Sequence, residues 1–510
     1  MGPPEDDMDM VMKPDRKTWR WLGAFSLALA STLFAAPARA QSTCSDGPAS
    51  PAPYPCSADL TNIVFDWSTA TAAGDGDIWP IAWGPDDALG RDLYTAFGDG
   101  RGFSGKWGSS FAFSVVDGAA GGTITGEDIS EHTVRREWCL DDNADVDPAG
   151  CSSGGGKVDG MVAVDGNFFF VLQQQDKIVA NSWSLTLGYS TDGLVTFSQC
   201  NKTLFPRGEG FWPLGLVHFG KNYAGGPTYI YVLATGDRNQ DNLWIMRIPR
   251  PDPSRPQDVC DAKTQGVFQR WEFLSGPDTD GDGVFDGGTP TWSGAQVNRV
   301  AIFRDSLHAY TPNVQWVPEL GRFILTIFHS TTGATGPADQ NGLGVFEATD
   351  PWGPWSTIRY FDSWGATAGV TNVDFPLGWN IVPKWTESGG RVLWGAWSGK
   401  GVLDVFNVTK ATLTVGMTTN EPPATPSIVS VSSITGSSAV LESSAFSDPD
   451  PGAIHVASEW QVAVAGGDFS SPVAASGATS IALTSWSVTG LTSGTMYQSR
   501  VRHRDNGGTW

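Results

Sequence analysis

Five copies of a strand–turn–strand unit lie between residues 58 and 416, and this repetition restricts the fold more than any other feature of the chain. The copies occupy residues 79–98, 160–173, 213–235, 311–329 and 376–398. Each has two apolar runs around a turn rich in glycine, aspartate or proline, which is the pattern of a β-hairpin. Repeats of this kind without intervening helices are typical of blades arranged around an axis. The sequence therefore predicts an all-β fold with a five-bladed β-propeller over residues 58–416.

The composition agrees with many short strands and restricts the choice of partner. The 510 residues include 62 glycines and 33 prolines, and 17% of residues are charged, which points away from helical bundles. A net charge of −22 argues against nucleic-acid backbones and anionic membrane surfaces as partners. The 23 tryptophans of this acidic chain suit a neutral or weakly charged carbohydrate. We therefore expect a polysaccharide as the partner and a monomeric protein.

The N-terminal residues 1–40 have the pattern of an export signal. An apolar run over residues 22–36 is followed by the small-residue cleavage site Ala38-Arg39-Ala40. Four basic residues precede that run: Lys13, Arg16, Lys17 and Arg20. No later run approaches the ~20 apolar residues of a membrane span. We expect a secreted or periplasmic protein.

The six cysteines fit an oxidising compartment. Fifteen pairings are formally open. Proximity favours Cys44–Cys56 and Cys139–Cys151, which leaves Cys200–Cys260. The first of these bonds would pin a leader at residues 41–57. Close CxxC-type pairs, which a zinc site would need, are absent from the sequence.

Two aspartates bracket the first repeat. Asp77 precedes its first apolar run and Asp99 follows its second, with the turn residues 85–90 between the runs. In an antiparallel hairpin these two positions lie at the same rim, and a pair of carboxylates is what glycoside hydrolysis requires. Both acids also stand next to glycines, so two ordinary turn residues are the alternative. The two acids are set among Trp79, Trp83, Tyr94 and Phe103. Of these, Trp79, Trp83 and Phe103 are predicted to contact the sugar.

Other polar and aromatic residues are candidates for the same site. Glu209 and Asp374 open the third and fifth repeats and are reserve carboxylates, with a structural role as the alternative for each. Lys157 and Arg304 are candidates for contacting sugar hydroxyls, and a solvated face is the alternative. The candidate stacking platforms are Trp107, Trp212 and Tyr310, for which a core role is the alternative.

An acidic segment has the spacing of a calcium loop. Acids occupy positions 1, 3, 5 and 9 of this loop, and glycine occupies position 6. Position 12 is Thr289 instead of the usual glutamate. We predict a structural calcium ion here, with a solvated acidic loop as the alternative, and we expect no cofactor for the chemistry. The predicted ligands are Asp278, Asp280, Asp282 and Asp286.

The C-terminal residues have a different pattern. Residues 417–424 have the composition of a linker, and residues 425–510 alternate serine, threonine and valine. Trp460, Leu491 and Tyr497 resemble the core tryptophan and the turn-and-tyrosine corner of the fibronectin type III family. The resemblance implies a β-sandwich whose last strand would begin near Trp510, so we expect a truncated domain.

Several phrases within residues 58–416 resemble an exported five-bladed propeller family that has long been catalogued as a domain of unknown function and whose relatives include D-arabinan-cleaving glycoside hydrolases. The phrases are Asp77-Ile-Trp-Pro, Phe97-Gly-Asp99-Gly, Phe219-Gly-Lys-Asn-Tyr-Ala-Gly225, Trp271-Glu-Phe-Leu-Ser-Gly276, Trp352-Gly-Pro-Trp355 and Lys410-Ala-Thr-Leu. The resemblance implies acidic catalytic residues in the first blade, and Asp77 and Asp99 are the positions that match. The chain departs from the family pattern at the 137–157 insertion and at the acidic 278–286 loop.

We therefore expect an exported glycoside hydrolase that cleaves an arabinan-like polysaccharide with Asp77 and Asp99. Two alternatives stay open. A polysaccharide lyase acting on a uronate polymer would use Arg304, His308 and Tyr310. A non-catalytic glycan-binding or adhesion propeller would bind sugar without needing either aspartate.

Overall fold

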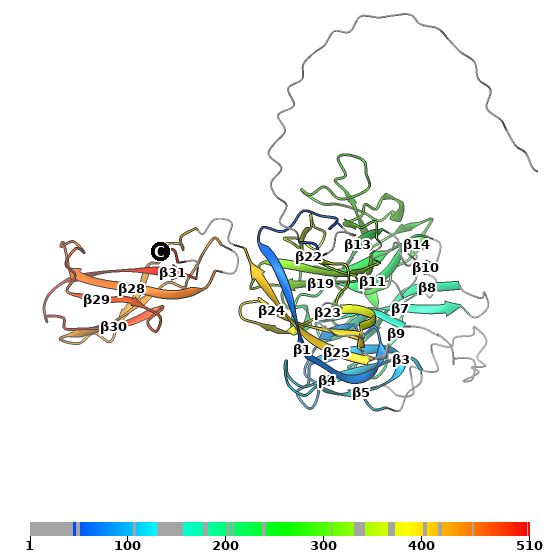
Figure 1. Ribbon diagram of the computed structural model, residues 1–510, viewed down its shortest axis with the longest axis horizontal. Coiled ribbons are helices and arrows are strands. Elements are labelled where there is room, and N and C mark those ends of the chain that lie inside the picture. Colours follow the sequence, from blue (N-terminus) through cyan, green and yellow to red (C-terminus); the bar gives the residue numbers. More distant parts are fainter. Residues whose placement is uncertain are drawn as a thin grey trace, which may run out of the picture. The chain divides into compact units, whose positions relative to one another are not determined.

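The protein is described from a computed structural model (Figure 1). It describes residues 44–46, 51–105, 109–129, 157–176, 182–200, 204–206, 209–236, 241–307, 309–330, 342–365, 373–400, 405–416, 421–450, 453–506 and 508–510. The predicted signal peptide at 1–40, Trp107, the Cys139–Cys151 bond and His308 lie outside these residues. Within them, no helix is long and apolar enough to span a membrane.

The chain is nearly all β, as predicted. Within the described residues the helices are short 3-10 turns: η2 (Lys221–Tyr223), η3 (Pro256–Val259) and η4 (Gln296–Asn298). Apolar runs form the strands because both of their faces are covered. Residues 168–172 of β7 (Asn167–Asp176), for example, are all 1% exposed or less. A continuous apolar run of this length is the pattern of a fully buried strand.

Residues 60–415 form four large antiparallel sheets. The first has the order β23 (Val373–Glu387), β24 (Val392–Lys400), β25 (Val405–Val415), β1 (Leu60–Asp77), β3 (Leu93–Gly102), β4 (Ser109–Asp117) and β5 (Thr125–Asp128), with β2 (Ile81–Trp83) paired to β3. The second contains β6 (Lys157–Val164), β7 (Asn167–Asp176), β8 (Ser182–Ser190), β9 (Ser198–Gln199) and β10 (Phe205–Pro206). Because β1 pairs with both β25 and β3, the first sheet joins the last repeat to the first.

The third sheet contains β11 (Trp212–Leu216), β12 (Tyr229–Thr235), β13 (Asn242–Pro249), β16 (Glu272–Gly276), β17 (Thr291–Ser293) and β18 (Phe303–Arg304). The fourth contains β19 (Tyr310–Val317), β20 (Arg322–His329), β21 (Gly342–Ala348) and β22 (Ser356–Phe361). A small hairpin pairs β14 (Lys263–Thr264) with β15 (Val267–Phe268).

All five predicted strand pairs are antiparallel hairpins: β2–β3, β6–β7, β11–β12, β19–β20 and β23–β24. The first strands of these hairpins contact one another in a closed cycle, in the order β2, β6, β11, β19, β23 and back to β2. Their backbones approach closely, since a Cβ on Gly160 would lie 2.7 Å from the Cα of Gly215. We call these five strands the inner strands. The starts of the inner strands form one region where residues from different sheets meet, and their ends form another.

Two of the three predicted disulfides lie within the described residues, and both are present. Cys44–Cys56 closes the leader, which forms bridges with Thr357 and Tyr360 of β22. Cys200–Cys260 links the end of β9 to the segment after η3.

The C-terminal residues form two three-stranded sheets that share one core. One sheet is β26 (Ile428–Ser432), β27 (Ser438–Ser443) and β30 (Ser485–Thr489), and the other is β29 (Ala474–Thr479), β28 (His455–Val464) and β31 (Tyr497–Asp505). Trp460 is fully buried between them. The hydroxyl of Tyr497 accepts a hydrogen bond from the Thr492 N–H at 2.7 Å. The fibronectin resemblance of this module stays a prediction.

Candidate functional site

A buried acid–amine pair lies where two inner strands start. Asp77 is the last residue of β1 and is 7% exposed. Lys157, the first residue of β6, forms an ion pair with its Oδ2. Gly98 of β3 stands opposite Asp77 in the ladder, and a Cβ on Gly98 would lie 2.3 Å from Asp77 Oδ1. The carboxylate therefore occupies space that only a glycine leaves open, and two residues predicted to share a site are in contact.

Asp99 follows Gly98 in β3, so the register brings the two predicted aspartates to neighbouring positions on paired strands. The side chain of Asp99 lies outside the described atoms. The expected position of Asp77 at the start of the hairpin strand differs from the observed one, because Asp77 ends β1 and β2 begins only at Ile81. A turn separates the two strands.

That turn is strained. Ile78 and Trp79 have φ values of 74° and 48°, a region that non-glycine residues rarely adopt and that is a true outlier for a β-branched side chain. The Trp79 N–H donates to the Asp77 carbonyl at 3.0 Å, which makes the segment a γ-turn centred on Ile78. Pro80 follows, although a residue before proline favours the extended region. Each such residue costs on the order of 1–3 kcal/mol, and outliers of this kind concentrate at functional sites.

Trp79 is a core residue, and its prediction as a sugar-binding side chain needs correction. Its indole is completely buried and donates from Nε1 to the Gly76 carbonyl at 2.6 Å. The ring packs against Phe97, Phe103 and Phe406, with centroids 5.3, 5.5 and 4.9 Å away. A ring enclosed on both faces offers no surface to a sugar. Its role here is to hold the backbone beside Asp77.

Other predicted aromatic contacts are distributed over different places. Phe103 is partly buried against Trp79 and Phe406. Trp212 is 1% exposed and belongs to the largest core cluster, which corrects its prediction as a stacking platform for the same reason as Trp79. Tyr310, the first residue of β19, is partly exposed at the start of its inner strand.

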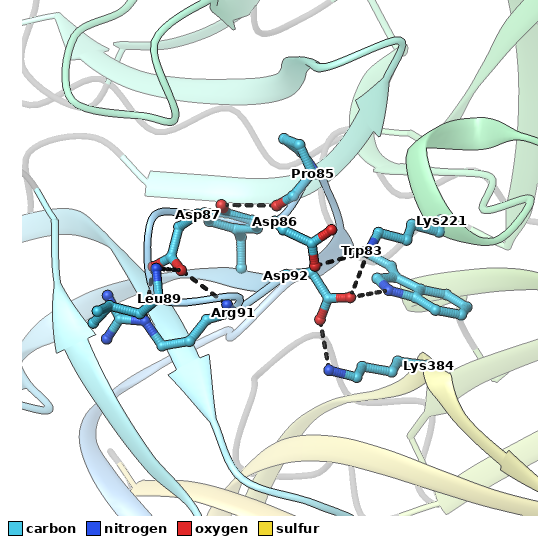
Figure 2. A network of polar contacts seen from close by, with 10 residues as sticks. Trp83, Pro85, Asp86, Asp87, Leu89, Arg91, Asp92, Lys221 and Lys384 are labelled. Atoms are coloured by element: carbon cyan, nitrogen blue, oxygen red, sulfur yellow. Dashed lines mark hydrogen bonds and ion pairs between the residues drawn. The ribbon is translucent and has the colours of Figure 1, made fainter.

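Trp83 lies at the opposite end of the β2–β3 hairpin, in a charged network (Figure 2). Its Nε1 donates to Asp92 Oδ2 at 2.9 Å, Lys221 donates to the same oxygen at 2.9 Å, and Lys384 donates to Oδ1 at 2.6 Å. Lys221 also pairs with Asp86 at 3.0 Å. Asp92 is 6% exposed, and burial raises its pKa, but the three hydrogen bonds outweigh burial and leave the pKa below its ordinary value.

The reserve carboxylates and Arg304 have other partners. Glu209 forms an ion pair with Lys263 of the β14–β15 hairpin, and the side chain of Asp374 in β23 lies outside the described atoms. Arg304 binds the acidic loop and its own sheet. Its Nη2 donates to the Asp282 carbonyl at 2.9 Å and its Nε donates to Asn242 Oδ1 at 2.9 Å. These contacts therefore argue against Arg304 as a substrate-binding residue.

In the acidic loop, ligand atoms of Asp278, Asp280 and Asp286 lie within 4.8 Å of one another. Carboxylate oxygens at this spacing are the donors that a hard cation takes. Asp282 differs from its prediction, because its Oδ2 lies 3.4 Å from Arg304 Nη1 and its Oδ1 accepts from the Val284 N–H at 2.7 Å. The calcium site stays a prediction with three clustered acids in place of four.

Sequence reasoning missed Asp92, Lys221, Lys384 and Asn380. Asp92 follows the turn residues 85–90, and the two lysines, in η2 and β23, lie 129 and 292 positions away from it in sequence. Asn380 is a single amide in an apolar strand. No local pattern marked Asp92, Lys384 or Asn380, and Lys221 stood out only as part of the phrase over residues 219–225.

No known family model matches the chain, and no curated protein matches it. Among solved structures, it is similar to the exo-β-1,3-galactanase of Phanerochaete chrysosporium, with a TM-score of 0.38 and 12% identity, covering 87% of this chain and 94% of that one. The xylan β-1,4-xylosidase of Bacillus halodurans C-125 gives a TM-score of 0.35 and 11% identity, covering 77% and 73%. The levansucrase of Bacillus subtilis gives 0.37 and 10%, covering 70% and 91%. Similarity at this level assigns no activity, so the function rests on the residues described above.

Proposed function

We propose that the protein is an exported glycoside hydrolase on a five-bladed β-propeller, with Asp77 and Asp99 as its carboxylate pair. The observation that carries the proposal is the buried Asp77 carboxylate, which faces Gly98 across the ladder, contacts Lys157 and immediately precedes a strained turn. The closed cycle of inner strands supports the propeller. In a propeller with this cycle, residues from all five repeats would surround one axis.

The contact with Lys157 supports a division of roles. An ammonium group next to a carboxylate favours its charged form. Asp77 is therefore the group that activates water or attacks the anomeric carbon. Asp99 is left as the acid, which gives its proton to the glycosidic oxygen as that bond breaks. Water supplies the new hydroxyl on the sugar. Its remaining proton goes to Asp77 where Asp77 activates the water, and back to Asp99 where Asp77 is the nucleophile and water cleaves the glycosyl–enzyme bond.

The proposed substrate is a neutral polysaccharide, with an arabinan-like glycan favoured by the phrases around the two aspartates. The alternatives receive less support from the contacts. The lyase would need Arg304 for a uronate carboxylate, yet Arg304 is bound to Asp282 and Asn242. A non-catalytic glycan-binding protein would give the buried Asp77–Lys157 pair no chemical task.

The test is a screen of the exported protein against neutral and uronate polysaccharides, with reducing-end release and absorbance of unsaturated sugar as separate readouts. Asp77→Asn should abolish release while glycan binding persists. Glu209→Gln is the control, since it removes a carboxylate that is also paired with a lysine. Turnover that survives in Asp77→Asn but is lost in Glu209→Gln would transfer the catalytic role to Glu209. Unsaturated product would establish the lyase.

A further inference from the structure

One side-chain amide from the fifth repeat holds the strained turn of the first. Asn380 lies in β23, and its Nδ2 donates to the Ile78 carbonyl at 3.1 Å and to the Trp79 carbonyl at 3.0 Å. These are the carbonyls of the two left-handed residues that follow Asp77. The contact joins residues 302 and 301 positions apart in sequence.

The turn needs such a partner because the sheet does not supply one. The pairing of this segment with β3 passes from Asp77 opposite Gly98 to Ile81 opposite Thr95. The backbone of residues 78–80 therefore falls outside the ladder. Buried carbonyls without a strand partner must be satisfied by other donors. The Asn380 amide satisfies two of them, and the Thr95 hydroxyl donates to the Pro80 carbonyl at 2.8 Å.

The fold prepares Asn380 for this contact. Gly378 has a φ of 60°, and a Cβ there would lie 3.0 Å from the Asn380 Nδ2. The position therefore favours glycine both for its backbone and for the space it leaves. On the other side, the Ile381 N–H donates to Asn313 Oδ1 of β19 at 3.2 Å. The amide is thus fixed by residues before and after it.

The opposite side of the turn is also fixed. The buried Trp79 indole donates to the Gly76 carbonyl, so the residues before and after Asp77 are tied to each other. With the indole on one side and Asn380 on the other, the backbone of Asp77 has little freedom. The carboxylate of Asp77 then meets Lys157 in one defined position.

We propose that Asn380 is a positioning residue that maintains the γ-turn and thereby places the Asp77 carboxylate against Lys157. Its catalytic consequence rests on the proposed function, whereas its effect on the Asp77–Lys157 contact does not. The two claims therefore have separate readouts. A shift of about 1 Å in a reacting group can cost on the order of 100-fold in rate.

The first readout needs no substrate. Trace acetylation with acetic anhydride, followed by mass spectrometry of the Lys157 peptide, measures how strongly Asp77 holds the ammonium group. The variants are Asn380→Ala and the isosteric Asn380→Asp, which keeps the volume and loses the amide donor. Asp77→Asn sets the upper limit of the signal. Asn407→Ala is the matched control, because Asn407 is fully buried and its Nδ2 also donates to two carbonyls, those of Val405 at 2.9 Å and Trp397 at 3.4 Å.

We expect Lys157 labelling to rise several-fold in both Asn380 variants, towards the level of Asp77→Asn, and to stay unchanged in Asn407→Ala. Unchanged labelling in a folded Asn380 variant would overturn the proposal, and so would an equal rise in Asn407→Ala. The second readout is turnover of the glycan that the screen identifies. There, kcat should fall about 10- to 100-fold with KM little changed in the Asn380 variants and with neither altered in Asn407→Ala. If Asp77→Asn retains turnover, the proposed function fails while the labelling result still decides the role of Asn380.

Discussion

The two ends of the β2–β3 hairpin each carry a buried aspartate, and they differ in how the backbone supports it. Asp77 precedes two non-glycine residues with positive φ. Asp92 follows a turn in which the positive φ belongs to Gly90, a residue that adopts it freely. Asp92 is bound by Trp83, Lys221 and Lys384 (Figure 2). Under the proposed function the strained first end carries the chemistry. The charge network at the second end is a structural tie, in which Lys221 of η2 and Lys384 of β23 share Asp92.

The largest expected effect separates the two ends by activity. Asp77→Asn should lower kcat on the identified glycan by about 10²- to 10⁴-fold, the range typical of acid–base groups. It should also lower the urea unfolding midpoint, because it breaks the ion pair with Lys157. Asp92→Asn should keep kcat within a few-fold. Steady-state kinetics and urea titration of both variants provide the comparison. Loss of turnover in Asp92→Asn without loss of folded protein would contradict the assignment of the ends.

As pH falls, the protein should lose stability through its buried histidines at a higher pH than through the Asp92 tie. Burial lowers the pKa of His218 and of His329 from 6.5 to about 4. A histidine with a depressed folded pKa stabilises above its unfolded pKa, and this contribution is lost as pH falls from about 6.5 to about 4. Each histidine contributes up to about 3 kcal/mol.

The tie responds at lower pH because the Asp92 pKa lies below its ordinary value of 3.8. Its stabilisation is present above that value and is lost only as pH falls through the lowered pKa. Urea unfolding between pH 7 and 4 should therefore have a smaller pH slope in His218→Gln and the wild-type slope in Asp92→Asn. A flatter slope in Asp92→Asn would show that the tie titrates in this window.

Removing the charge at Asp92 should lower the free energy of unfolding, but by less than the loss of a fully buried ion pair. Asp92→Asn leaves two lysines without their shared carboxylate, and breaking a buried pair costs about 3–5 kcal/mol. Lys221 and Lys384 have side chains 33% and 35% exposed, so water screens part of this, and we expect about 1–3 kcal/mol. The urea midpoint measures the loss, and an unchanged midpoint would show that the network adds no stability.

The smallest effect is expected for Lys221→Met. Lys221 bridges Asp92 and Asp86, and the Asp86 side chain is 60% exposed. Exposed ion pairs contribute about 0–1 kcal/mol, so the free energy of unfolding, measured by urea titration, should fall by no more than that. A larger loss than in Asp92→Asn would mean that η2 is held mainly by this lysine.

Much of the fold followed from local sequence. Each predicted strand pair is an observed hairpin because turn-forming residues and apolar runs act within about ten to twenty positions. Ser190 and Asp192 likewise close their own turn, with Asp192 accepting from the Thr196 N–H at 2.9 Å. Asp77 and Asp99 do lie at neighbouring positions, but through the pairing of β1 with β3 and not through the predicted hairpin, because Asp77 ends β1.

The site was predictable only in part. Asp77 and Lys157 were each predicted as site residues. Their contact was not predicted, because it joins positions 80 apart in sequence. The burial of Trp79 and Trp212 was not visible, because an aromatic residue in a short apolar run suits a core and a platform equally well. Packing of neighbouring sheets decided between the two.

The sequence by itself determined where the chain turns and which runs become strands. Those outcomes depend on backbone preferences and on interactions between near neighbours. The tertiary structure decided that Lys157 faces Asp77, that Lys221 and Lys384 share Asp92, and that Asn380 supports the turn after Asp77. These contacts form only when the first and last repeats meet through β1 and the inner strands complete their cycle.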